Sequence, residues 1–151
     1  MRMKVILQRV THASCVVDEQ VTGEIKDGYM ALVGISTEDQ EDVLEKMADK
    51  VVNLRVFSDE EGKMNRSLLD VKGEILSISQ FTLYADAKKG RRPSFTHAAK
   101  PDVSLPMYNQ FNELLKAKGV HVETGIFGAD MKISLLNDGP VTIILDSDQL
   151  L

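Results

Sequence analysis

Two short segments combine residue types that could carry out chemistry. Residues 79–85 read Ser-Gln-Phe-Thr-Leu-Tyr-Ala, and residues 137–142 read Asn-Asp-Gly-Pro-Val-Thr. The first segment follows an apolar run typical of a β-strand, and the second lies between two such runs, 131–136 and 141–145. A strand that only has to be buried would not select these residues, so each segment indicates either a turn or a site.

In the first segment, backbone amides and hydroxyls come together. Backbone N–H groups are released from the sheet where a strand ends, and free N–H groups beside a hydroxyl are the components of an oxyanion hole. The hydroxyls of Ser79 and Thr82 could also position a water or a ribose. A second interpretation stays open, in which Ser79 and Thr82 are surface residues and Phe81 belongs to the core.

In the second segment, Gly139 and Pro140 expose the main chain. Glycine has no Cβ and proline has no N–H, so the pair presents carbonyl oxygens with little side-chain bulk in front of them. A ligand brought here would be recognised by backbone. An X-Pro bond is cis in roughly 5–6% of cases in folded proteins. The alternative is a plain turn that joins two strands.

Other catalytic patterns find little support. His12, His97 and His121 stand in no zinc motif, and Cys15 fits a small core residue better than a nucleophile. Ser94 and His97 leave a Ser-His hydrolase open, although no nucleophile elbow surrounds Ser94. The acidic turn 59–63 lacks the ligand spacing of a calcium loop, and no glycine-rich phosphate loop is present. We therefore expect no metal and no cofactor, and a hydrolase would depend on backbone dipoles and on its substrate.

Composition and charge restrict the class of protein. A chain of 151 residues, 43% of them hydrophobic, predicts a single domain over residues 1–151 with one sizeable core. The net charge of −5 argues against a protein that holds DNA or other nucleic acid by general electrostatics. One dense positive cluster follows the first segment, and it either guides the end of a polyanion or is a solvated loop; its members are Lys88, Lys89, Arg91 and Arg92, with Lys100 nearby.

Location is predicted from what the chain lacks. The single cysteine cannot form an internal disulfide, no charged-then-apolar leader opens the chain, and no apolar run approaches the ~20 residues that span a bilayer. We expect a cytoplasmic protein without a membrane partner.

The periodicity of apolar residues predicts strands and two main helices. Strands are expected at 3–10, 14–17, 21–25, 29–35, 55–57, 74–79, 121–124 and in the 131–145 segment, with a hairpin turn at 18–20. A helix should follow a capping box made by Thr37 and Gln40, with apolar positions recurring from 43 to 52. A second helix is expected at about 102–118, capped by Asp102 or Ser104, with Pro106 in its first turn. These elements predict a mixed α/β domain of α+β type, with a sheet or partly closed β-barrel core packed by two helices.

Taken together, the two segments resemble those of the D-aminoacyl-tRNA deacylase family. Residues 7–14, 57–65 and 92–95 agree as well, and the similarity extends from residue 1 to residue 146. The resemblance implies a homodimer that hydrolyses the ester between a D-amino acid, or glycine, and the 3′ end of tRNA. A module that binds an RNA end or a small molecule without turnover remains the alternative.

The resemblance also implies roles for individual residues. Gly139 and Pro140 would form a cis peptide that enters the partner subunit's active site and excludes L side chains, with Arg9 as its support. Residues 79–82 would line the pocket: Ser79 would contact substrate, and Gln80 and Phe81 would direct backbone N–H groups at the scissile carbonyl. Thr82 would take part in catalysis, although an adjacent ribose 2′-OH could assist instead. At position 84 a small residue would fit the pattern equally well, so Tyr84 is interpreted as a peripheral change without consequence for chemistry.

Overall fold

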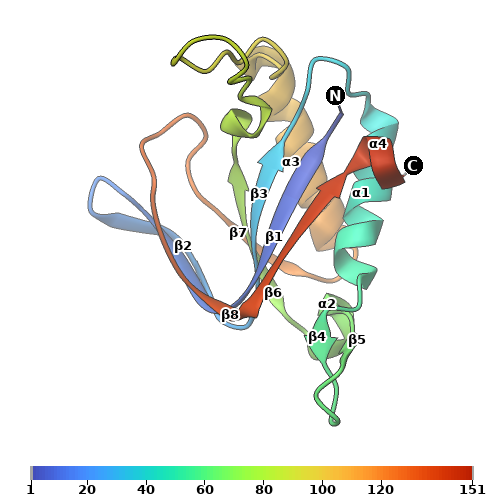
Figure 1. The fold of residues 1–151 in the computed structure, drawn as a ribbon. Helices are drawn as coiled ribbons and strands as arrows, with labels where there is room; N and C mark the ends of the chain where they lie inside the picture. Colours follow the sequence, from blue (N-terminus) through green and yellow to red (C-terminus); the bar gives the residue numbers. More distant parts are fainter. Residues whose placement is uncertain (1, 151) are drawn as a thin grey trace.

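A computed structural model describes residues 2–150 as one mixed α/β domain (Figure 1). The main sheet has the strand order β2-β1-β3-β6-β7, and β8 pairs with β1 from the other side. Its strands are β1 (Lys4–Val17), β2 (Gln20–Ile25), β3 (Gly28–Gly34), β6 (Glu74–Ser79), β7 (His121–Thr124) and β8 (Lys132–Asp146). A separate pair consists of β4 (Phe57–Ser58) and β5 (Met64–Arg66). The helices are α1 (Glu41–Asn53), α2 (Leu68–Val71), α3 (Pro101–Ala117) and α4 (Ser147–Leu150), with a 3₁₀ turn η1 (Phe81–Tyr84) after β6.

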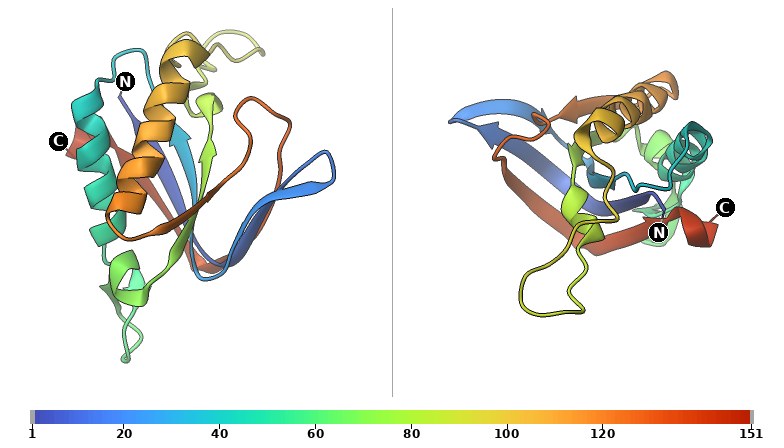
Figure 2. Two further views of the ribbon diagram at one scale, coloured as in Figure 1. Left: turned by 180° about the vertical axis from the view of Figure 1, so that it is seen from behind. Right: turned by 90° about the horizontal axis from the view of Figure 1, so that it is seen from above.

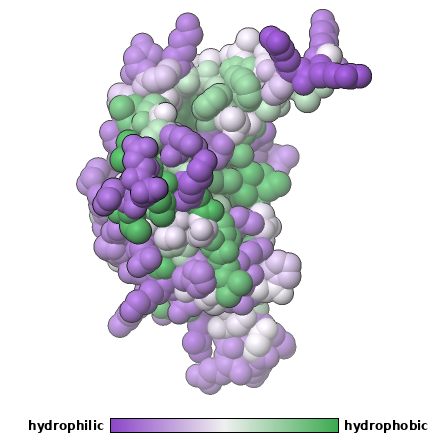
Figure 3. Space-filling view, turned by 90° about the vertical axis from the view of Figure 1, so that its left-hand side faces the viewer, coloured by the Kyte–Doolittle hydropathy of each residue, from purple (hydrophilic) through white to green (hydrophobic). Residues whose placement is uncertain are grey.

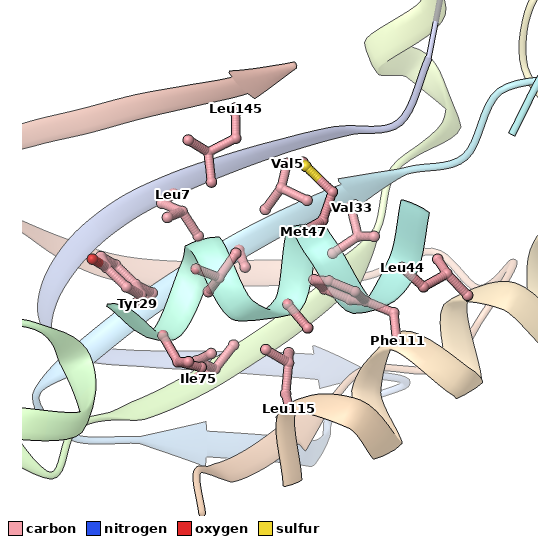
Figure 4. Close-up of a cluster of buried hydrophobic side chains, with 14 of the residues drawn as sticks. Val5, Leu7, Tyr29, Val33, Leu44, Met47, Ile75, Phe111, Leu115 and Leu145 are labelled. Atoms are coloured by element: carbon pink, nitrogen blue, oxygen red, sulfur yellow. The ribbon is translucent and has the colours of Figure 1, made fainter. Parts of the chain in front are cut away.

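The main core lies between the sheet and the two long helices. Helices α1 and α3 lie side by side on one face of the sheet (Figure 2), and Figure 4 shows side chains from both helices meeting those of β1, β3 and β6. Leu7, Leu44, Met47 and Phe111 are fully buried there. The apolar spacing of each helix explains this arrangement, because residues three and four apart share a face.

A second apolar cluster fills the curl of the sheet. It includes Cys15, Ile25, Met30, Leu76 and Ile78, all of them buried. Strand β2 approaches β7 so closely that a Cβ on Gly23 would lie 2.6 Å from the carbonyl oxygen of Thr124. The sheet is therefore nearly closed, which confirms the expected partly closed barrel.

Strands β1 and β8 bend together between the two clusters. Val5 and Leu7 face the helices, whereas Val10, Ala13 and Cys15 face the second cluster, so β1 changes the side that it buries at Arg9 and Val10. Figure 1 shows this corner at the lower end of the sheet. The β1–β8 register shifts there, as expected of a β-bulge, which bends a strand and increases its twist.

Some local predictions are wrong. Helix α1 is preceded by Gln40 without a side-chain cap, and the predicted Thr37–Gln40 capping box does not form. Asp39 dominates this turn instead, because its carboxylate accepts the N–H groups of Ser36 at 2.6 Å and Met3 at 2.7 Å. The strand predicted at 55–57 is observed as β4, and the short helix α2 was not predicted.

Helix α3 also begins differently from the prediction. It starts at Pro101 after Lys100, so Asp102 and Ser104 lie within the helix and neither caps it. Pro106 lies inside the helix beyond the first turn. Proline is pre-organised for the first helical position, and Pro101 occupies it here.

No helix within residues 2–150 is long and apolar enough to cross a membrane.

Candidate active site

The first segment forms a tight turn at the end of β6. The N–H of Gln80 still donates to the carbonyl oxygen of Val33 at 2.8 Å, and the chain then enters η1. The backbone N–H of Gln80 is therefore used in the sheet, which corrects the expectation that this group points at a substrate. Within residues 2–150, the N–H groups of Phe81 and Thr82 form no hydrogen bond. The available donors are thus the amides of Phe81 and Thr82, one residue further along than predicted.

Thr82 is exposed, and among residues 2–150 no carboxylate, histidine or lysine forms a hydrogen bond with its hydroxyl. Its hydroxyl accepts a hydrogen bond from the side-chain amide of Gln80, a contact within the same turn. An amide donor cannot remove a proton from a hydroxyl. The contact orients the Thr82 hydroxyl without activating it.

Beside this turn lies a cavity of about 540 Å³. Its wall includes Ser79, Gln80 and Phe81, together with the start of α3 and residues 127–131 of the loop that leads into β8. A volume of this size falls within the usual range for small-ligand sites, about 300–1,000 Å³. Thr82 is not part of the cavity wall.

The cavity is mainly apolar with a few polar groups. Phe81, Phe95 and Phe127 line it, and the rings of Phe81 and Phe95 pack edge to face with centroids 5.1 Å apart. Lys100 and Asp130 are the charged residues of the wall. Figure 3 shows hydrophobic side chains exposed between hydrophilic ones on this face of the molecule. Such a wall suits a ligand that carries both apolar and polar groups.

Tyr84 anchors the turn, and its interpretation as peripheral is wrong. The ring is fully buried, and its hydroxyl lies 2.7 Å from the carbonyl oxygen of Arg2 and 2.8 Å from that of Gly34. Burial raises the pKa of the Tyr84 phenol, so the hydroxyl stays protonated and can donate. Tyr84 thereby ties η1 to the start of β1 and the end of β3.

The second segment forms an exposed bulge within β8. Gln8 pairs with Thr142 and Val10 pairs with Asn137, so Arg9 alone stands opposite residues 138–141. The Gly139-Pro140 peptide is cis, and Asp138, Gly139 and Pro140 are exposed in succession. The segment is thus neither a plain turn between two strands nor an ordinary part of the ladder.

Two side chains hold this bulge. Arg9 donates from Nε to the carbonyl oxygen of Asp138 at 3.1 Å and from Nη1 to that of Val56 at 2.7 Å. Asn137 donates from Nδ2 to the carbonyl oxygens of Arg9 and Val141, each at 3.0 Å. The supporting position of Arg9 agrees with the sequence prediction, whereas Asn137 was not assigned a role. An amide side chain within an otherwise apolar strand pattern was the available signal.

Gly139 cannot be replaced without strain. Its φ of +126° is a conformation that L residues rarely adopt, and a Cβ would lie 2.9 Å from Nη2 of Arg9 and 2.8 Å from Cγ2 of Val141. The missing Cβ thus makes room for the supporting arginine.

Within one chain the two segments lie far apart. Ser79 pairs with Val33, Val33 with Val5, and Val5 with Leu145, so Leu145 is the β8 residue level with the start of the first segment. Pro140 precedes Leu145 by roughly 17 Å of extended chain, and β8 is separated from β6 by β1 and β3, about 14 Å across the sheet. Arg9, Gly139 and Pro140 accordingly form no part of the cavity wall.

The remaining candidates do not assemble into a site. No hydrogen bond joins the side chains of Ser94 and His97 in the described chain. Cys15 is fully buried, which confirms its predicted place in the core. In the turn 59–63, the carboxylate of Asp59 accepts N–H groups from Glu61, Lys63 and Asn65. Across residues 2–150, no three His, Cys, Asp or Glu side chains are grouped so that they could hold a metal ion.

Known proteins resemble the chain over nearly its whole length. The family model described as D-Tyr-tRNA(Tyr) deacylase matches residues 6–146. A D-aminoacyl-tRNA deacylase of Bacillus pumilus is 58% identical over 97% of this chain and 100% of its own length. The corresponding protein of Thermus aquaticus is 56% identical, covering 97% of each chain.

Solved structures share the fold. That of a c-Myc DNA unwinding element binding protein is 42% identical with a TM-score of 0.90, covering 95% of this chain and 97% of its own. That of a probable eukaryotic D-amino acid tRNA deacylase is 19% identical with a TM-score of 0.84, covering 96% and 99% respectively, and it bears on the fold alone.

The fold is that of a mixed α/β protein with a nearly closed sheet and a cavity at the end of β6. The chain belongs to the D-Tyr-tRNA(Tyr) deacylase family.

Proposed function

We propose that this protein hydrolyses the ester bond of D-aminoacyl-tRNA, and of mischarged glycyl-tRNA, to free amino acid and tRNA. The observation that carries the proposal is the family match over residues 6–146, combined with two unpaired backbone amides, that of Phe81, which lines the cavity, and that of the next residue, Thr82. The proposed reaction uses no metal or cofactor. The proposed place of action is the cytoplasm.

The chemistry rests on stabilising charge at the carbonyl oxygen. Attack on an ester places negative charge on that oxygen, and fixed N–H donors stabilise the charge without reorganising. Removing one such donor typically costs ~10²–10³ in rate. Because no base lies beside Thr82, the ribose 2′-OH of the substrate is the proposed aid to catalysis, and Thr82 with Ser79 positions the ester.

Selection against L-aminoacyl groups is assigned to Gly139 and Pro140 of a second copy of the chain. Their distance from the cavity of the same chain supports an action across a subunit boundary, in the cavity of a neighbouring copy. Two large apolar side chains flank the bulge on β8 and are exposed, Leu136 by 55% and Ile144 by 67%. Such residues suit an interface, which supports a homodimer.

In this homodimer the filter is a wall of main chain. The carbonyl oxygens of the Gly-Pro segment would accept hydrogen bonds from the substrate amino group, while the close backbone would leave no space for a side chain of L configuration. A D side chain, or the hydrogen of glycine, projects away from the wall. Discrimination then comes from exclusion of the wrong substrate as well as from contacts with the right one.

The direct test is hydrolysis of D-Tyr-tRNA, Gly-tRNA and L-Tyr-tRNA by the purified protein under single-turnover conditions. We expect release of D-Tyr and glycine and retention of L-Tyr on tRNA. Stoichiometric retention of charged tRNA without release would instead support a binding module. Loss of all activity in Ser94→Ala would support a serine hydrolase, which the missing hydrogen bond between the Ser94 and His97 side chains disfavours.

DNA is not among the proposed partners, although the 42% identical protein of known structure is named for binding a DNA element. The net charge of −5 opposes a grip on a long duplex. An electrophoretic mobility assay with duplex and single-stranded DNA checks this, and retention at about 0.15 M salt, where weak electrostatic contacts are screened, would overturn it.

A further inference from the structure

The loop that leaves and returns at the cavity has an unusual concentration of charge. Residues 86–94, here called the basic loop, include four cationic side chains, Lys88, Lys89, Arg91 and Arg92, all exposed. None of the four forms an ion pair in the described part of the chain. The only carboxylate of the loop, on Asp86, accepts the N–H of Lys88 at 3.0 Å.

The base of the basic loop is fixed. Asp86 and Ser94 exchange two backbone hydrogen bonds, of 2.7 and 2.8 Å, which close the loop into a stem. Below the stem, Phe81 precedes the loop and Phe95 follows it, and the contact of their rings forms part of the cavity wall. The loop is therefore attached to the cavity on both sides, while its tip points away from the body of the domain (Figure 2, right).

Electrostatics alone do not favour this arrangement within the free protein. Four like charges within five residues repel one another, and the rest of the chain is acidic enough to give a net charge of −5. A polyanion would neutralise all four. Because the tip spans up to ~13 Å beyond the stem when extended, it reaches groups just outside the cavity rather than within it.

We propose that the basic loop binds backbone phosphates of the last nucleotides at the 3′ end of RNA, next to the residue whose ester occupies the cavity. This inference rests on the proposed function, since it supplies the polyanionic part of the same substrate. Lysine and arginine bind phosphates without reading sequence, so the loop positions the RNA and does not select among tRNAs.

The test compares variants and substrates. K88Q/K89Q/R91Q/R92Q removes the charge of the basic loop, and K88Q/K89Q is matched by K46Q/K50Q, which removes two exposed charges from α1. Rates are measured on D-Tyr-tRNA and on D-tyrosyl-adenosine, an ester that has no phosphates, between about 50 and 300 mM salt, a range over which phosphate contacts weaken steeply.

We expect kcat/KM of the quadruple variant K88Q/K89Q/R91Q/R92Q on D-Tyr-tRNA to fall at least about tenfold at low salt, mostly through a higher KM. The slope of log kcat/KM against log salt should become shallower by about 3, at ~0.7–0.9 for each phosphate contact. Hydrolysis of D-tyrosyl-adenosine should stay within about twofold of wild type. K88Q/K89Q should account for part of the change in slope, and K46Q/K50Q for none.

An unchanged salt slope in the quadruple variant would overturn the proposal. A change in slope in K46Q/K50Q as large as that in K88Q/K89Q would overturn it as well. Binding of the loop to anionic vesicles or acidic proteins predicts that unchanged slope. Failure of the wild type on both esters would refute the proposed function itself, whereas cleavage of both with an unchanged slope refutes only the role of the loop.

Discussion

Asn137 spans the exposed bulge of β8: its side-chain nitrogen donates to the carbonyl oxygen of Val141, four residues further along, at 3.0 Å. The same nitrogen donates to the carbonyl oxygen of Arg9 on β1 at 3.0 Å. One amide thus joins both ends of the bulge, which carries Gly139 and Pro140, to the neighbouring strand.

We predict that Asn137→Asp lowers both kcat/KM on D-Tyr-tRNA, by about tenfold, and discrimination against L-Tyr-tRNA. The replacement keeps the shape of the side chain but turns a donor into an acceptor that faces two carbonyl oxygens. Ser134→Asp adds the same charge at an exposed position of the same strand and should change neither quantity. Preserved discrimination in Asn137→Asp would show that the amide does not position the filter.

Arg9→Lys should reduce kcat/KM on D-Tyr-tRNA by about 10- to 100-fold. A lysine cannot reproduce the fork by which Arg9 reaches both Asp138 and Val56, so the bulge loses one of its anchors. Arg55→Lys is the matched control, because Arg55 makes a similar fork to Asn65 away from the site, at 2.9 and 2.6 Å. Steady-state kinetics on both variants, with thermal unfolding as a measure of folding, decide the point; equal activity losses would contradict it.

Thr82→Ala should keep appreciable activity, with a loss below about tenfold, whereas Gly139→Ala should lose at least about 100-fold. The first change removes a hydroxyl that has no base, and the second forces a Cβ against Arg9 and Val141 at a φ of +126°. Gly62→Ala tests the cost of a positive φ alone, without a steric clash, because Gly62 has a φ of +79° and open space around it. Single-turnover rates measure all three, and equal losses in Thr82→Ala and Gly139→Ala would argue against substrate-assisted hydrolysis.

The turn between β4 and β5 should weaken in acid. Hydrogen bonds from the backbone of Lys63 and from the side chain of Asn65 lower the pKa of Asp59 below its ordinary value of 3.8. A lowered pKa in the folded state means that the stabilisation is present above about pH 4 and is lost as the pH falls through the folded pKa. Urea unfolding at about pH 7 and about pH 3, on either side of the ordinary pKa, should show that the stability advantage of wild type over Asp59→Asn shrinks in acid. A constant difference would refute this role of the carboxylate.

The sequence predicted the fold where local patterns decide it. Alternating apolar residues located β1 and β2, and residues at helical spacing located α1 and α3, because these periods directly reflect which face is buried. The cap of α1 was predicted wrongly because Asp39 bonds to the N–H of Met3, a contact distant in sequence that a local motif does not contain.

The site was predicted only in part, for a related reason. Residue types identified both segments, but the bulge opposite Arg9 follows from the register of β1 with β8, which joins the two ends of the chain. Tyr84 was misjudged because its hydroxyl bonds to carbonyl oxygens of Arg2 and Gly34, which are distant in the sequence. The hydrogen bond from the backbone N–H of Gln80 to Val33 likewise depends on the neighbouring parallel strand β3.

The central claim is that one chain supplies the amides of Phe81 and Thr82 while a second chain supplies Gly139 and Pro140. Mixing Phe81→Pro, which removes one amide donor, with Gly139→Ala tests this most directly, because a mixed dimer would contain one intact site. After unfolding and refolding together at equal amounts, half of the dimers would be mixed, and we predict about one quarter of wild-type deacylation from two nearly inactive variants. Activity no greater than the sum of the separate variants, with mixed dimers demonstrated by mass spectrometry, would contradict the claim.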